Sequence, residues 1–420
     1  MSSDQFDQAA NRRRFLQFLA ASPLIAAGAG PALAETLLPK PKAPDPLMWG
    51  PMDPADLIKT PKDAINVFDF EPVARQKVPP AHFGYMAAGI DDEVTLRNNR
   101  SDFQKVVLRP RRLRDVSKVD MKTTIFGVTY DSPIFVCPVG GQRSFHEDGE
   151  IGTAKACKTG NHLQILSTVT SNSVEDVTAA RGAPIWQQLY ATNKWEVAKA
   201  VVERAEKAGC IAVAVTVDRS GGRNQETLFR LRRTDTRECS GCHDNSSVQA
   251  SYRTRPMYNT LDMSGLRNIQ SSAMTWDFFK RMRDVTKMKI VIKGILAPED
   301  AALAAENGID GIIVSNHGGR AEDSGLSTIA ALPDIVEAVK GRMPIFVDSG
   351  FRRGSDAVKA LAMGATAVGI GRPYIWGLGA FGQAGVERVL ELLREELYGM
   401  LQQMGAQSIK DLSPEMVRRA

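Results

Sequence analysis

The sequence predicts a (β/α)8 barrel with a long lid after its fourth strand. Eight apolar runs of strand length occur along the chain, and helix-like segments such as 196–207 and 356–363 separate most of them. Short alternation of strands and helices requires a parallel sheet, and eight such units make a barrel. The chain has 420 residues, of which 43% are hydrophobic, so it is long enough to bury a core of this size. The eight runs are 134–139, 163–168, 185–190, 211–218, 289–294, 312–317, 345–350 and 367–371.

The first 34 residues predict an export signal rather than part of the fold. Asn11-Arg-Arg-Arg-Phe-Leu-Gln17 resembles a twin-arginine signal, and an apolar run over 18–30 follows it. Ala32-Leu-Ala34 offers small residues for cleavage, which gives a mature start near Glu35. The apolar run is too short and too rich in glycine and alanine for a stable membrane span. The succession of basic, apolar and cleavage segments favours export to the periplasm over a disordered basic tail.

Residues 35–61 contain seven prolines, which predicts an extended linker before a barrel domain over 62–420. Within that domain, the connection after the fourth run (219–275, called the lid below) is long, polar and rich in arginine. A connection of that length is usually an active-site lid or disordered. The chain ends with a predicted helix over 386–404, whose apolar residues recur at helical spacing and indicate core packing rather than a cofactor site. These residues are Val386, Leu390, Leu393, Leu397, Met400 and Met404.

Charge and cysteine content argue against two classes of protein. The net charge is +5, and basic and acidic residues are intermixed, so the sequence shows no stripe for nucleic acid. Five cysteines by count make neither a disulfide framework nor a tetrahedral metal site.

The stretch with the clearest chemistry is Gly311-Ile-Ile-Val-Ser-Asn-His-Gly-Gly-Arg320. Its apolar residues predict a buried strand, His317 stands just past the end of that strand, and the two glycines allow a sharp turn before Arg320. A base that titrates near neutrality and a bidentate anion binder suit a substrate with a carboxylate and an abstractable proton. The alternative is a histidine in an ordinary loop, but the position at the carboxyl end of a barrel strand favours function.

Polar residues follow the other apolar runs as well. Because all carboxyl ends of barrel strands meet at one face, these residues predict a single site. The loops after strands seven and eight often bind phosphate in barrels, which indicates a phosphate site near 350–352 and 371–372. The residues at the strand ends are Pro138, Val139, Gly140, Ser167, Gln188, Tyr190, Thr216, Asp218, Lys293, Ser315, Asp348, Gly350, Arg352, Gly371 and Arg372.

The decapeptide resembles a signature of the FMN-dependent 2-hydroxy-acid oxidoreductases, which include glycolate oxidase, lactate oxidase, mandelate dehydrogenase and the flavocytochrome lactate dehydrogenases. Ala81-His-Phe-Gly-Tyr-Met-Ala-Ala-Gly89 is similar to the family's Tyr-Tyr-x-x-Gly segment, which places Tyr85 at the substrate carboxylate. The resemblance covers about 67–412 and implies bound FMN and a small 2-hydroxy-acid substrate. We also expect a homo-oligomer.

The resemblance assigns cofactor-binding roles to most strand-end residues. Gly350, Arg352, Gly371 and Arg372 would hold the FMN phosphate, Asp348 the ribityl hydroxyls, and Gln188, Thr216 and Ser167 the isoalloxazine ring, with Pro138, Val139, Gly140 and Ser315 beside them. Lys293 would place a cation where negative charge accumulates on reduction. The alternative for Lys293 is a structural salt bridge.

The resemblance also assigns the chemistry. Arg320 and Tyr85 would clamp the substrate carboxylate, and His317 would act as the base. Asp218 would stabilise the imidazolium, and Tyr190 would hydrogen-bond the substrate hydroxyl. The expected reaction is oxidation of an (S)-2-hydroxy acid such as lactate to the 2-oxo acid.

Three positions depart from the family pattern. Gly222-Arg-Asn-Gln-Glu226 stands where members often have Gly-Arg-Arg-Glu, so the second arginine, which lies near the substrate in relatives, is missing from the pattern. Val169 replaces a tryptophan of glycolate oxidase, and Gly140 replaces an alanine of the oxidases. These departures leave the substrate and the electron acceptor open.

The lid contains Cys239-Ser-Gly-Cys242-His243, which matches the attachment sequence of c-type haem. The alternatives are a disulfide and two free thiols, and no helical cytochrome domain surrounds the motif. We expect electrons to leave to a cytochrome, a quinone or dioxygen. The rival functions are an FMN barrel of isomerase type and an electron-transfer protein built on the Cys-x-x-Cys-His motif.

Overall fold

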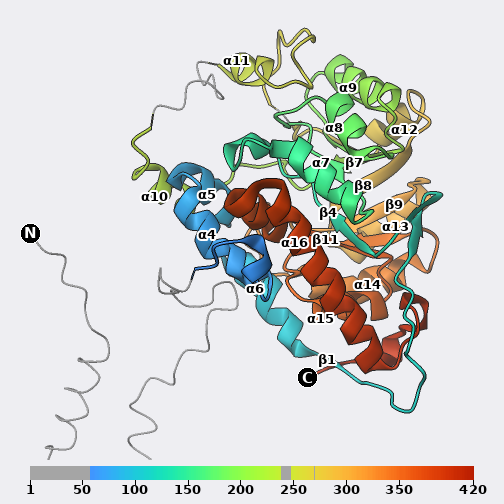
Figure 1. Ribbon diagram of the computed structural model, residues 1–420. Helices are drawn as coiled ribbons and strands as arrows, with labels where there is room; N and C mark the ends of the chain where they lie inside the picture. The colour runs from blue at the N-terminus through green and yellow to red at the C-terminus, as the bar shows by residue number, and fades with distance from the viewer. Residues whose placement is uncertain (1–56, 238–246, 269) are drawn as a thin grey trace, which may run out of the picture. The chain divides into compact units, whose positions relative to one another are not determined.

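Eight parallel strands form a closed barrel in the computed structural model, which describes residues 57–237, 247–268 and 270–420 (Figure 1). The strand order is β4-β11-β10-β9-β8-β7-β6-β5. A hydrogen bond of 2.9 Å from Val136 N to Leu163 O joins the two end strands and closes the sheet. The predicted (β/α)8 barrel is confirmed. The strands are β4 (Ile134–Val136), β5 (Ile165–Leu166), β6 (Trp186–Tyr190), β7 (Ala212–Thr216), β8 (Lys289–Ile295), β9 (Gly311–Val314), β10 (Ile345–Val347) and β11 (Ala367–Ile370).

Several strands end two or three residues before the predicted ends, because the residues that follow have backbones unsuited to a strand. β9 stops at Val314, and His317 then has a φ of 60° and Gly318 a φ of 72°. β4 stops at Val136, two residues before Pro138, which has no N–H to donate to a neighbouring strand. The predicted runs therefore combined each strand with the first residues of its functional loop.

Aromatic side chains fill the barrel interior. The rings of Trp186 and Phe346 pack edge to face with their centroids 5.2 Å apart, and Phe135 meets Phe346 at 6.2 Å. The hairpin of β2 (Thr123–Ile125) and β3 (Val128–Tyr130) places Phe126 in a stack on Trp186 at 5.2 Å. Trp186 begins β6, so the hairpin covers the amino end of the barrel and the carboxyl end is left for the site.

Helices surround the barrel, and α16 is the longest of those described (Figure 1). It runs from Arg372 to Met404 with a kink at Phe381 and Gly382, whose φ/ψ angles are not helical. The predicted helix 386–404 is its second part, and its apolar stripe is buried except for Met400, which is partly buried. The helices that follow the strands are α7 (Gly149–Thr159), α8 (Val174–Arg181), α9 (Trp195–Lys207), α12 (Asp277–Arg283), α13 (Pro298–Glu306), α14 (Thr328–Val339), α15 (Gly354–Ala362) and α16.

The described part of the lid contains regular secondary structure. It forms α10 (Glu226–Arg232) and α11 (Val248–Arg253). Met257, Tyr258 and Met263 are almost fully buried, so a few apolar residues anchor this arginine-rich segment. Residues 238–246 and 269 lie outside the described residues, and with them the motif Cys239, Cys242 and His243.

Among the described residues, three α-helices precede the barrel: α4 (Phe70–Lys77), α5 (Pro80–Ala87) and α6 (Val94–Ser101). α5 packs against α10 of the lid and lies beside it in Figure 1. A short antiparallel pair of β1 (Val106–Leu108) and β12 (Val417–Arg419) joins the start of the barrel domain to the end of the chain. The predicted export signal and most of the predicted linker lie outside the described residues, but Leu57 and Ile58, within the predicted linker, pack against the core.

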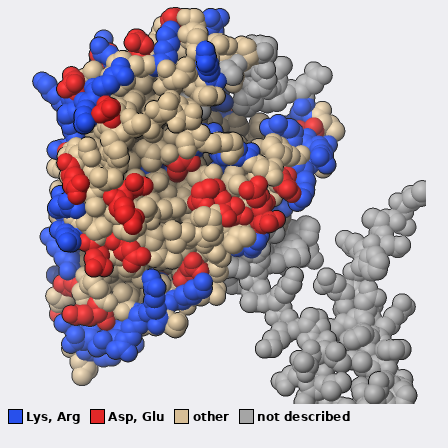
Figure 2. Space-filling model, turned by 180° about the vertical axis from the view of Figure 1, so that it is seen from behind, with Lys and Arg blue, Asp and Glu red and all other residues tan. Residues whose placement is uncertain are grey.

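The surface carries patches of both charge signs on the face seen in Figure 2. Within the described ranges, no helix is both long enough and apolar enough to cross a membrane.

Candidate active site

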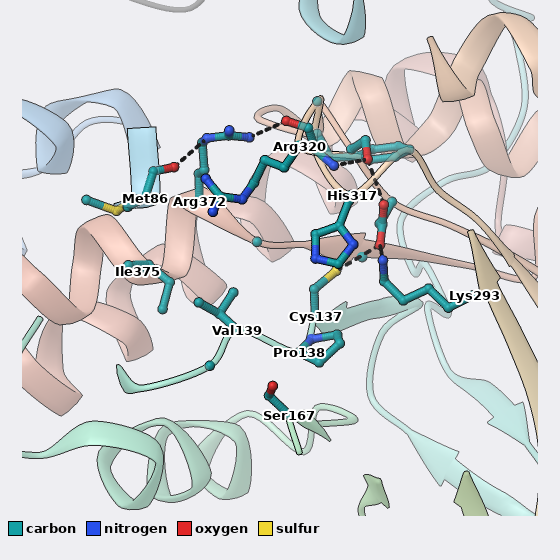
Figure 3. Close-up of a pocket in the computed structure, with 18 of the residues that line it drawn as sticks. Met86, Cys137, Pro138, Val139, Ser167, Lys293, His317, Arg320, Arg372 and Ile375 are labelled. Carbon is teal, nitrogen blue, oxygen red and sulfur yellow. Dashed lines mark hydrogen bonds and ion pairs between the residues drawn. The ribbon is translucent and has the colours of Figure 1, made fainter. Parts of the chain in front are cut away.

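A pocket opens at the carboxyl ends of the strands, with about 810 Å³ of empty space counting its mouth. Fourteen predicted residues line it, of which Figure 3 labels Pro138, Val139, Ser167, Lys293, His317, Arg320 and Arg372. The others are Tyr85, Gly140, Tyr190, Asp348, Gly350, Arg352 and Gly371. Residues from distant parts of the chain thus meet in one place, as the strand ends predict.

Four predicted residues lie behind this wall and support it. Gln188 Nε2 donates to Thr216 Oγ1 over 2.9 Å, and Ser167 Oγ donates to Gln188 Oε1 over 3.3 Å. Ser315 Oγ donates to Asp348 Oδ1 over 2.7 Å. The fourth, Asp218, accepts a bond from His317. Gln188, Ser315 and Asp218 are one hydrogen bond away from residues that line the pocket, and Thr216 is two hydrogen bonds away.

The backbone around His317 is held in an uncommon conformation. His317, Gly318 and Gly319 all have positive φ, at 60°, 72° and 73°. A methyl group on Gly319 would lie 2.6 Å from Leu96 Cα, so only glycine fits there. A non-glycine residue in the left-handed region costs on the order of 1–3 kcal/mol and persists where the surroundings hold it. The strain fixes the direction of the His317 side chain.

His317 is a neutral base oriented by two neighbours. Its Nδ1 lies 2.8 Å from Asp218 Oδ1, and its Nε2 lies 3.4 Å from the Tyr190 hydroxyl. Burial lowers the pKa of His317 to about 4; Asp218 opposes this shift and Lys293 adds to it. Burial opposes the ionisation of Asp218, yet its interaction with His317 and the charge of Lys293 hold its pKa below the usual value. An ionised Asp218 only accepts, so Nδ1 carries the proton and Nε2 is left to take one from a substrate.

Lys293 provides a permanent positive charge in the pocket. Its Nζ lies 3.6 Å from Asp348 Oδ2 and 3.8 Å from Asp218 Oδ2, and it donates to Ser315 Oγ over 2.8 Å. Burial alone would lower the pKa of Lys293, but the two carboxylates raise it above the usual value. Lys293 therefore forms the salt bridges that were the structural alternative and also lines the pocket.

Arg320 lies beside Tyr85, as predicted. Its guanidinium carbon is 4.7 Å from the centroid of the Tyr85 ring, and Nη1 donates to the carbonyls of Tyr85 and, over 2.9 Å, Ala88. These bonds fix the guanidinium at the pocket wall, where its fork suits a carboxylate.

The part of the pocket that lies opposite Lys293 (Figure 3) fits the phosphate of FMN. Arg352 is buried and Arg372 partly buried, and desolvation followed by neighbouring arginine charges lowers their pKa to about 10 and about 9. Arg372 donates to Met86 O over 2.9 Å and Gly318 O over 2.8 Å, and Arg352 to Phe351 O over 2.9 Å. No carboxylate of the described residues forms an ion pair with either guanidinium.

Two desolvated cations beside the first residues of α16 therefore offer a strong anion site. Arg372 and Lys293 lie on opposite sides of the pocket (Figure 3). The side with Arg372 would hold the FMN phosphate, and the side with Lys293 would hold the isoalloxazine ring. The residues present fit FMN.

Sequence reasoning missed two arginines of the lid. The guanidinium carbon of Arg219 lies 4.9 Å from the centroid of the Tyr190 ring, and Arg223 Nη1 donates to Arg320 O over 3.4 Å. Arg223 is the first arginine of the Gly-Arg-Arg-Glu pattern, so the loss of the second arginine stays a prediction, and Arg219 and Arg223 are additional cations near the site. The many arginines of the lid indicated positive charge near the site, but they did not indicate which of them would reach the pocket.

Comparisons with known proteins agree with this geometry. Residues 74–419 match the family described as FMN-dependent dehydrogenase. An L-lactate oxidase of Lysinibacillus sphaericus (strain C3-41) is 42% identical over 347 residues, which cover 82% of this chain and 90% of the relative. A peroxisomal (S)-2-hydroxyacid oxidase of Arabidopsis thaliana is 36% identical, with 84% and 96% covered.

Solved structures give the same result. A mandelate oxidase with benzoyl-formic acid superposes with a TM-score of 0.74 at 34% identity, covering 84% of this chain and 98% of that one. The flavin-binding domain of baker's yeast flavocytochrome b2 superposes with a TM-score of 0.75 at 31% identity, covering 85% and 87%. Fold and site define an FMN-binding oxidoreductase barrel. The chain belongs to the FMN-dependent dehydrogenase family, within its 2-hydroxy-acid oxidases and dehydrogenases.

Proposed function

We propose that this protein is an exported enzyme that oxidises an (S)-2-hydroxy acid of the lactate type to the 2-oxo acid. The observation that carries the proposal is the neutral imidazole of His317, held in one pocket with the carboxylate-binding pair Arg320 and Tyr85. The names of the relatives, which include lactate and (S)-2-hydroxy-acid oxidases, support the same substrate class.

Each residue of the site has a separate role in the proposed oxidation. Arg320 and Tyr85 bind the substrate carboxylate, which brings the hydroxyl-bearing carbon within reach of His317, since His317 and Arg320 belong to one short loop. Nε2 of His317 takes a proton from the substrate, and the buried Asp218 carboxylate stabilises the resulting imidazolium. Tyr190 donates a hydrogen bond to the substrate hydroxyl. FMN, when bound, supplies the acceptor for the two electrons that leave the substrate.

The test is an absorbance spectrum of the purified full-length protein before and after anaerobic addition of (S)-2-hydroxy acids. We expect an FMN spectrum that bleaches with (S)- but not (R)-enantiomers. Bound FMN that no 2-hydroxy acid reduces would favour an isomerase-type barrel instead. A haem spectrum without substrate-dependent bleaching would favour an electron-transfer protein.

We further propose a periplasmic location and a homo-oligomeric enzyme. The twin-arginine segment supports export. The double change Arg12→Lys, Arg13→Lys should leave the precursor in the cytoplasm, as measured by cell fractionation, whereas periplasmic recovery of this variant would contradict the assignment. Light scattering of the holoenzyme tests the oligomer.

The electron acceptor is proposed to be a cytochrome or quinone in preference to dioxygen, because Cys239, Cys242 and His243 match a haem-attachment motif in the connection that follows β7. Turnover with cytochrome c or a quinone analogue should therefore exceed turnover with dioxygen. Cys239→Ser, Cys242→Ser should slow acceptor reduction and spare flavin reduction. If haem is absent and this variant passes electrons normally, the motif has no part in electron transfer.

A further inference from the structure

The mouth of the pocket carries more positive charge than one carboxylate requires. Arg219 lies on the ring of Tyr190, and Arg223 lies at the backbone carbonyl of Arg320, so both lid arginines stand next to residues that line the pocket. One guanidinium fork is sufficient for the carboxylate shared by all 2-hydroxy acids, and Arg320 supplies it.

The electrostatics show how closely these cations approach one another. Burial, and then the charges of Arg219 and Arg320, lower the pKa of Arg223 to about 10. Burial alone would raise the pKa of Tyr85, yet the charges of Arg320, Arg219 and Arg223 hold it below the usual value. No described carboxylate forms an ion pair with Arg219, Arg223 or Arg320. Half-buried like charges without a counter-ion are unfavourable, so a ligand that brings an anion would be stabilised there.

The pocket also has room for a substrate longer than lactate. A second chamber, with about 1400 Å³ of empty space counting open solvent, shares Tyr85, Gly140 and Val169 with the first pocket. Phe145 and Leu228 form apolar parts of its wall. The substrate side chain can therefore extend by several carbon atoms while its carboxylate stays at Arg320.

We propose that the site takes (S)-2-hydroxy acids with a second carboxylate, held by Arg219 and Arg223, in preference to monocarboxylates of the same length. This inference rests on the proposed function and narrows its substrate class. Arg320 binds the first carboxylate next to His317, and the lid arginines bind the second at the pocket mouth.

Matched substrates test the proposal in the holoenzyme. (S)-2-Hydroxyglutarate and (S)-2-hydroxypentanoate have the same number of carbon atoms and differ in the terminal carboxylate, and L-lactate is the short reference. We expect kcat/KM for flavin reduction to favour 2-hydroxyglutarate over 2-hydroxypentanoate by at least about tenfold, as for a charge-assisted contact. The products 2-oxoglutarate and 2-oxopentanoate should show the same order in Kd, read from flavin absorbance without turnover.

Variants of Arg219 and Arg223 test whether these two residues cause the preference for the dicarboxylate. Arg219→Met and Arg223→Met should each reduce the ratio between the two five-carbon acids, and the double variant should bring it close to one. Arg219→Lys and Arg223→Lys keep the charge and should retain part of the ratio, which separates binding of an anion from damage to the fold. Arg233→Met removes an exposed charge at the end of α10, whereas Arg219 and Arg223 are half-buried, so it is the control and should leave the ratio unchanged.

Two results would overturn the inference. One is a kcat/KM for 2-hydroxypentanoate equal to or above that for 2-hydroxyglutarate. The other is an equal loss on both acids in the methionine variants, which would mean that the arginines act on the shared carboxylate alone. Reduction by monocarboxylates only would overturn this inference and leave the proposed function intact, whereas reduction by no 2-hydroxy acid, lactate included, would overturn both.

Discussion

The two groups of arginines around the pocket are held in different ways. Arg352 and Arg372 follow β10 and β11, are buried and partly buried, and donate to the backbone carbonyls of Phe351, Met86 and Gly318 at 2.8–2.9 Å. Arg219 and Arg223 come from the lid and rest on an aromatic ring and on one carbonyl at 3.4 Å. The first group suits an invariant ligand such as a cofactor phosphate, and the second suits a substrate group whose position varies. The cofactor end and the lid end should therefore respond separately to substitution.

The largest effect is expected at the base between the two ends. His317→Gln removes the group that takes a proton and keeps the size of the side chain, so flavin reduction should slow by at least about a hundredfold while FMN stays bound. Stopped-flow absorbance measures the rate. His146→Gln, at a histidine that does not line the pocket, is the control. Near-normal reduction in His317→Gln would remove His317 from the role of base.

The cofactor end is tested by Arg372→Met. Loss of one buried charge-assisted contact of about 1.5–3 kcal/mol should weaken FMN binding roughly 10- to 100-fold. Fluorescence of FMN released on dilution of the holoenzyme measures the affinity. The ratio of 2-hydroxyglutarate to 2-hydroxypentanoate turnover in FMN-saturated protein should not change. A changed ratio with normal FMN affinity would show that Arg372 belongs to the substrate end.

The contrast between the residues at the strand ends and the residues of the lid also explains which site residues could be predicted from the sequence. His317, Asp348 and Arg372 could be placed because barrel strands end at one face, and the apolar runs locate those ends. The strand bounds were less accurate, since the positive φ of His317 depends on the close approach of Gly319 to Leu96. Arg223 could not be placed, because its contact with Arg320 depends on how α10 packs against α5, and local spacing carries no information about that packing.

A pH profile examines the pair formed by His317 and Asp218. His317 must be neutral to take a proton, so flavin reduction should be nearly constant above pH 5 and fall as the pH drops through the pKa of about 4. Asp218 raises the pKa of His317, so Asp218→Asn should move this fall to lower pH and weaken the base. The rate of Asp218→Asn at neutral pH should therefore be lower than that of the unchanged enzyme. A fall that moved to higher pH would contradict the assigned electrostatics.

The smallest effect is expected at Gly84 of α5, which faces α10 of the lid, whereas the next two residues of α5, Tyr85 and Met86, line the pocket. A methyl group there would lie 3.1 Å from Leu231 Cβ and 3.2 Å from Leu228 Cα, so α10 must shift by a few tenths of an ångström. Gly84→Ala gains about 0.5–1 kcal/mol of helix propensity, which offsets part of the crowding, and the Tm should change little.

Because α10 follows Arg223 by only three residues, the shift should change the position of this arginine. Gly84→Ala should therefore lower the preference for the dicarboxylate by about two- to threefold, which corresponds to roughly 0.4–0.7 kcal/mol, and leave FMN affinity unchanged. Gly399→Ala in α16 is the matched control, since a methyl group on Gly399 meets no neighbouring atom within 4 Å. It should gain the helix propensity without altering the preference. A change in FMN affinity in Gly84→Ala would show that the shift also reaches Arg372, which donates to Met86 O of the same helix.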